Sequence, residues 1–89
     1  MPTKNVVISA EAGLHGRPAA ALAQAVSASG HAVWLRRESA AAETSVDAAS
    51  MLSVMALNIG RGEEIEIGSH TPATEGLLEA LAALLVAAE

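Results

Sequence analysis

The chain has 89 residues, a net charge of −5 and no cysteine. This length makes one domain, 1–89, with a single modest core, and the lack of cysteine excludes disulfides and thiolate metal sites. Nucleic-acid binding needs a basic footprint and stacking aromatics, yet Arg36-Arg37 is the only basic pair and Trp34 the only aromatic residue. No apolar run reaches the length of a membrane span. We expect a soluble cytoplasmic protein that binds neither nucleic acid nor membrane and needs no metal or cofactor.

The first half of the chain predicts a strand, a helix and two more strands. Residues 4–9 have a β-branched centre and are typical of a strand. A helix follows, with Pro18 in its first turn and Gly30 at its end. Residues 32–37 predict a second strand, and residues 43–46 a weaker third one.

The second half adds a helix, a strand and a final helix. Asp47 is a good N-cap for a short helix that ends near Leu57. Residues 63–67 alternate strictly and predict a strand, whose two outward glutamates cannot be buried. Thr71-Pro72 opens the last helix, which carries an apolar stripe: Leu77, Leu78, Leu81, Leu84 and Leu85. The order β-α-β-β-α-β-α predicts an α+β fold, an open-faced sandwich in which three helices cover one face of a four-stranded antiparallel sheet.

Residues 13–18 place a histidine and an arginine at the mouth of the first helix. Backbone N–H groups near Gly16 and Arg17 lack intrahelical acceptors, and such a helix start binds anions. Gly16 has no Cβ to block a tetrahedral anion, and the planar fork of Arg17 suits phosphate oxygens. A histidine alone at this place would more often be a surface residue at a helix start. The combination predicts that the imidazole of His15 accepts a phosphoryl group.

Three motifs stand in order along the chain: residues 13–20, 46–52 and 60–65. Together they resemble the HPr family, the histidine phosphocarriers of the bacterial phosphoenolpyruvate-dependent sugar phosphotransferase system, from Lys4 to about Val86. The resemblance implies the same open-faced sandwich and a monomer that carries the phosphoryl group on Nδ1 of His15. It implies a courier rather than a free-standing enzyme, which receives the group from phospho-enzyme I and donates it to IIA domains.

A serine and an apolar stripe in the second helix are further candidates. By type alone, Ser50 is an ordinary serine in a first helical turn, but the resemblance maps it onto a serine that an HPr serine kinase phosphorylates in many lineages. Met51, Leu52 and Met55 have the spacing of core residues, although methionine is also common on surfaces that meet several partners. The resemblance makes these three the patch that docks onto enzyme I and IIA domains. We expect Met51 and Met55 to be exposed and Leu52 to be partly buried.

The chain also departs from the family pattern. Ala12 replaces a frequent polar residue, Gly16 stands where alanine or threonine is usual, and Ala49 stands where a lysine often precedes the serine. Two alternatives to a sugar phosphocarrier remain open. The chain could be a paralogue that serves a nitrogen-related or dihydroxyacetone-kinase phosphorelay, or a regulatory binding module controlled at Ser50.

Overall fold

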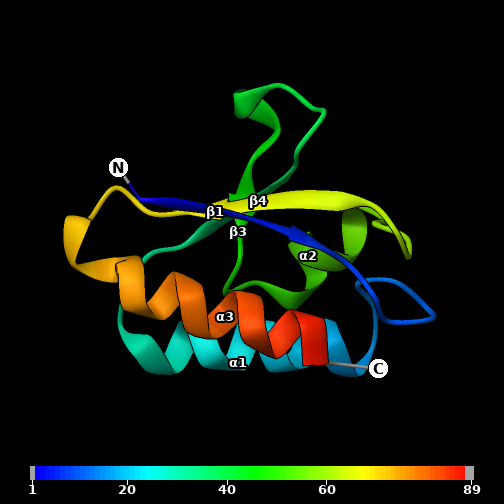
Figure 1. The fold of residues 1–89 in the computed structure, drawn as a ribbon, viewed down its shortest axis with the longest axis horizontal. Helices are drawn as coiled ribbons and strands as arrows, with labels where there is room; N and C mark the ends of the chain where they lie inside the picture. The colour runs from blue at the N-terminus through cyan, green and yellow to red at the C-terminus, as the bar shows by residue number, and fades with distance from the viewer. Residues whose placement is uncertain (1, 88–89) are drawn as a thin grey trace.

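The computed structural model describes residues 2–87, except for the side chains of residues 42, 73 and 87. The predicted order of strands and helices is confirmed, with a 3-10 turn added before the third strand and another before the last helix (Figure 1). In chain order the elements are β1 (Thr3–Val7), α1 (Arg17–Ser29), β2 (Trp34–Arg37), a 3-10 turn (Ala42–Thr44), β3 (Val46–Asp47), α2 (Met51–Ala56), β4 (Glu64–Gly68), a 3-10 turn (Pro72–Thr74) and α3 (Glu75–Ala87).

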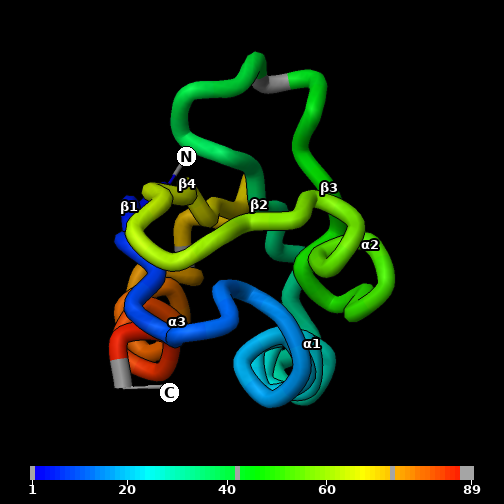
Figure 2. Tube along the Cα trace, turned by 90° about the vertical axis from the view of Figure 1, so that its right-hand side faces the viewer, coloured from blue at the N-terminus to red at the C-terminus, as the bar shows by residue number. Residues whose placement is uncertain are grey.

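The four strands form one antiparallel sheet in the order β1-β4-β2-β3. Helices α1 and α3 lie side by side under one face of the sheet, and the short α2 lies beside β3 and against α1 (Figure 2). The predicted open-faced sandwich is therefore confirmed. None of the helices within residues 2–87 is long and apolar enough to cross a membrane.

An aliphatic core fills the space between sheet and helices. The inward-facing residues of β1, β2 and β4 meet buried residues of α1 and α3, among them Leu22 and Leu81. The leucine stripe of the last helix is confirmed, because Leu78 and Leu85 are also buried, while Leu77 and Leu84 are partly buried at its margins. This core holds α1 through Ala19, Leu22 and Val26.

The prediction for the third strand and the second helix was wrong in its boundaries. Residues 42–44 form a 3-10 turn, and β3 contains only Val46 and Asp47. Asp47 does not cap α2; its Oδ1 accepts a hydrogen bond from the N–H of Ala49 at 2.9 Å. The N-cap is Ser50, whose Oγ accepts from the N–H of Ser53 at 3.2 Å. Both residues suit an N-cap, and the pairing of Asp47 with β2 decides between them.

The open face of the sheet carries polar residues and one aromatic ring. Trp34 lies over Gly68, where an added Cβ would come within 2.3 Å of the ring. Glu64 is exposed, as predicted. Glu66 is largely covered instead, because its carboxylate forms a 2.6 Å ion pair with Arg36. The ion pair makes the near-burial of this glutamate tolerable.

Candidate functional site

His15 lies between β1 and α1, immediately before the helix begins, and its side chain is half-buried. Figure 2 looks onto this end of the molecule, where the loop after β1, the first turn of α1 and the short α2 face the viewer. A half-buried ring at such a place is held on one side and accessible on the other.

The first turn of α1 has no side-chain cap. Gly16 is its N-cap, with φ 55° and ψ −123°, and no described side chain bonds to this end of the helix. An added Cβ on Gly16 would meet nothing within 4 Å, so an anion can approach the backbone here. Arg17 is exposed beside it, and Pro18 occupies the first turn as predicted. The N–H groups of this turn remain open to a ligand.

Backbone contacts fix the loop that carries His15. The N–H of Leu14 donates to the carbonyl of Ile59 at 2.9 Å, and both side chains are fully buried. Gly13 has φ 76°, and an added Cβ would lie 2.3 Å from the Ile59 oxygen and 2.9 Å from Gly60 Cα. Only glycine allows this approach. The histidine therefore follows two residues that are anchored to the segment after α2.

The predicted exposure of the α2 side chains was wrong. Met51 and Met55 are partly buried and pack against the core, whereas Leu52 is 83% exposed. The helix leans on α1 with its methionine face and presents Leu52 to solvent. A shallow groove of about 500 Å³ lies between α1 and the start of α2, lined by Gln24 and small side chains of α1 together with Ala49 and Met51.

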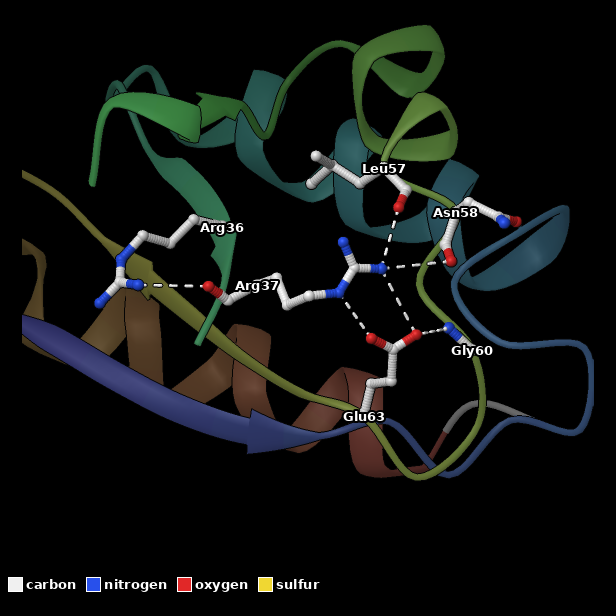
Figure 3. Close-up of polar contacts among 6 residues, drawn as sticks. All are labelled: Arg36, Arg37, Leu57, Asn58, Gly60 and Glu63. Atoms are coloured by element: carbon white, nitrogen blue, oxygen red, sulfur yellow. Dashed lines mark hydrogen bonds and ion pairs between the residues drawn. The ribbon is translucent and has the colours of Figure 1, made fainter. Parts of the chain in front are cut away.

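Arg37 and Glu63 form an ion pair at the C-terminal end of α2, which the sequence analysis missed (Figure 3). Arg37 Nε donates to Glu63 Oε1 at 2.6 Å, and Arg37 Nη2 donates to the Leu57 carbonyl at 3.0 Å and to the Asn58 carbonyl at 3.4 Å. Glu63 Oε2 accepts from the N–H of Gly60 at 2.6 Å. Arg37 thus binds the carbonyls that α2 leaves unpaired at its C-terminal end.

The same contacts shift the pKa of both partners. The hydrogen bond from Arg37, followed by that from the Gly60 N–H, holds the pKa of Glu63 below its ordinary value. The hydrogen bond to Glu63 raises the pKa of Arg37 further. Within residues 2–87, no three His, Cys, Asp or Glu side chains are grouped so that they could hold a metal ion.

Comparison with known proteins identifies the family. Residues 2–87 match the family model described as the PTS HPr component phosphorylation site. The chain belongs to the HPr family. It is 38% identical to the phosphocarrier protein HPr of Streptomyces coelicolor over 85 residues. This match covers 96% of this chain and 88% of that protein. It is therefore a phosphocarrier of the phosphotransferase system.

Solved structures of HPr proteins have the same fold as this chain. A phosphocarrier protein HPr from Bacillus anthracis superposes with a TM-score of 0.81 at 32% identity, over 94% of this chain and 95% of that one. HPr-C-His from Thermoanaerobacter tengcongensis superposes with a TM-score of 0.83 at 26% identity, over 97% of this chain and 92% of that one. The fold and the family thus agree with the three sequence motifs.

The lowered pKa of Glu63 predicts how stability depends on pH. Its ionised form stabilises the fold above the unfolded pKa of about 4.3, and this contribution is lost as pH falls through the folded pKa. Glu63→Gln should therefore be less stable than wild type at pH 7, and the difference should shrink steadily below about pH 5. Urea unfolding of both proteins at a series of pH values measures this difference in the free energy of unfolding. A difference that stays constant into the acid range would contradict the assignment.

Proposed function

We propose that His15 accepts a phosphoryl group from phospho-enzyme I and passes it to a IIA domain, as a cytoplasmic carrier and not as a free-standing enzyme. The observation that carries this proposal is the half-buried imidazole placed directly before an uncapped helix start. The exposed Arg17 stands next to the same turn. Family membership supports the partners, since carriers of this system exchange phosphoryl groups with other proteins.

The chemistry follows from this placement. A neutral ring nitrogen attacks phosphorus while the bond from phosphorus to the donor protein breaks, and the family resemblance makes Nδ1 of His15 the acceptor. The phosphoryl oxygens then lie near the N–H groups of Gly16 and Arg17. Phosphoryl transfer depends mostly on positioning and on charge stabilisation. An exposed site that a partner completes can both receive the group and release it.

We assign the docking of partner proteins to Leu52 and to the groove between α1 and α2, a surface that we call the docking face. Leu52 is the exposed large apolar side chain of α2, and its neighbour Met51 lines the groove together with Ala49 and residues of α1. Met51 and Met55 support this surface from beneath, where they pack against the core. The docking face therefore rests on a side chain that helical spacing alone would have assigned to the core.

Ser50 adds a candidate for regulation by an HPr serine kinase. Its Oγ caps α2 through the N–H of Ser53, and it directly precedes Met51 and the exposed Leu52. A phosphate there would add a charge of about −1.5 to −2 beside the docking face. Because the chain already has a net charge of −5, such a group would weaken the docking of an acidic partner surface.

The role of His15 predicts a specific labelling pattern. Incubation with phosphoenolpyruvate and catalytic enzyme I should add one acid-labile phosphoryl group, detected by intact-mass spectrometry before and after mild acid. His15→Ala should abolish the label because it removes the attacking nitrogen. His31→Ala is the matched control, since His31 is exposed and lies beyond the far end of α1. Labelling of the His15→Ala variant would overturn the proposal.

The exposure of α2 predicts opposite behaviour for two neighbouring residues. Leu52→Ala should leave the free energy of unfolding within about 0.5 kcal/mol of wild type. It should weaken enzyme I binding about tenfold or more, because a buried leucine contributes roughly 1.5–3 kcal/mol at an interface. Met51→Ala should lose stability, by less than the roughly 2–5 kcal/mol of a fully buried site.

Urea unfolding and calorimetric titration with enzyme I separate the two effects. Val7→Ala is the control, because Val7 is 54% exposed and lies in an edge strand at the other side of the sheet. Unaltered enzyme I affinity in Leu52→Ala would remove this residue from the docking face.

A further inference from the structure

The ion pair between Arg37 and Glu63 connects three parts of the chain that are distant in sequence. From β2, the guanidinium of Arg37 reaches the carbonyls at the end of α2 and the carboxylate of Glu63 just before β4 (Figure 3). The phosphoryl chemistry proposed above gives no part to either side chain. The pair nevertheless holds the C-terminal end of the helix that carries Leu52.

From Glu63 the contacts continue toward the histidine. Its second carboxylate oxygen accepts from the N–H of Gly60, and the Glu63 N–H donates to the Gly60 carbonyl at 3.2 Å. The adjoining Ile59 carbonyl accepts from Leu14, and Gly13 packs on the same two residues. The segment 59–60 is therefore bonded to Glu63 on one side and supports the loop before His15 on the other.

We propose that Arg37 and Glu63 are positioning residues for phosphoryl transfer, which hold α2 and the His15 loop in one fixed relation. A partner seated on Leu52 then meets the imidazole of His15 at the distance that transfer requires. This inference rests on the proposed function of His15. Its physical reason is that a displacement of about 1 Å can slow a positioned reaction on the order of a hundredfold.

The chain supplies a matched control pair. Arg36 and Glu66 form an ion pair of the same length, 2.6 Å, between β2 and β4 on the open face of the sheet. Their side chains are more buried than those of Arg37 and Glu63, at 17% and 19% exposure against 31% and 37%. Arg36 also donates to the carbonyls of Arg37, Glu38 and Ala40. Loss of its side chain should therefore disturb stability at least as much, although none of these contacts reaches the segment 59–60.

The experiment compares Arg37→Gln and Glu63→Gln with Arg36→Gln and wild type. Single-turnover transfer from phospho-enzyme I onto the carrier is measured against enzyme I concentration, well below the melting temperature of every variant. Arg37→Gln and Glu63→Gln should lower the saturating rate about tenfold to a hundredfold and leave the half-saturating concentration within about twofold, because Leu52 is still present. Arg36→Gln should transfer like wild type even where its melting temperature falls more.

The outcomes distinguish failure of the proposed function from failure of the positioning role. A wild-type chain that takes no phosphoryl group overturns the proposed function and this inference with it. Normal wild-type labelling together with unslowed Arg37→Gln and Glu63→Gln overturns the inference alone, as does an equal slowing of Arg36→Gln. If Arg37→Gln does not fold, Glu63→Gln carries the test, because the glutamine keeps an oxygen for the Gly60 N–H.

Discussion

The hydrogen bond from the Leu14 N–H to the Ile59 carbonyl is the contact on which the site depends. The segment between β1 and α1 has no regular structure to hold it. Ile8 exchanges hydrogen bonds with Glu63 and Gly62 at its start, and the bond from Leu14 to Ile59, with the buried Leu14 side chain, fixes the end that carries His15. Gly13 makes the close approach possible, since any side chain there would meet the Ile59 oxygen. His15 is the next residue after this anchor, and the helix begins two residues later.

Under the function proposed for His15, the same arrangement would bind the phosphoryl group without preventing its release. The helix macrodipole contributes about 0.3–1 kcal/mol at an exposed position, whereas hydrogen bonds to a charged group contribute about 1.5–3 kcal/mol each. The open N–H groups of the first turn and the exposed Arg17 therefore matter more than the dipole. Since the site lies at the surface, a docked partner can supply the remaining stabilisation and remove the group.

Local patterns in the sequence predict much of the fold and the position of the histidine. Pro18 and Gly30 mark the two ends of α1 by backbone chemistry that acts within a few residues, and alternation identifies β4. The start of α2 is not predicted correctly, because the sequence offers two good N-cap residues. Asp47 pairs with β2 instead, and Ser50 caps the helix. Helical spacing also leaves the inward face of so short a helix undecided, so Leu52 was assigned to the wrong side.

The contacts that the sequence does not predict join residues that are distant from each other along the chain. Arg37 and Glu63 lie 26 residues apart, and their meeting depends on the register of β2 and β4 and on the turn before β4. The packing of Gly13 on Ile59 is equally non-local. Nothing in the spacing of either pair indicates a contact, although the arginine stands at the end of a predicted strand.

Amide hydrogen exchange at Leu14 tests the central claim most directly. If the loop before His15 is anchored by the Ile59 carbonyl, the Leu14 amide should exchange only through large-scale unfolding, at a rate close to that of the core strands. The amide of Glu11, in the exposed turn before it, should exchange rapidly. A Leu14 amide that exchanges as fast as that of Glu11 would show that the loop moves freely, and would contradict a site positioned by this contact.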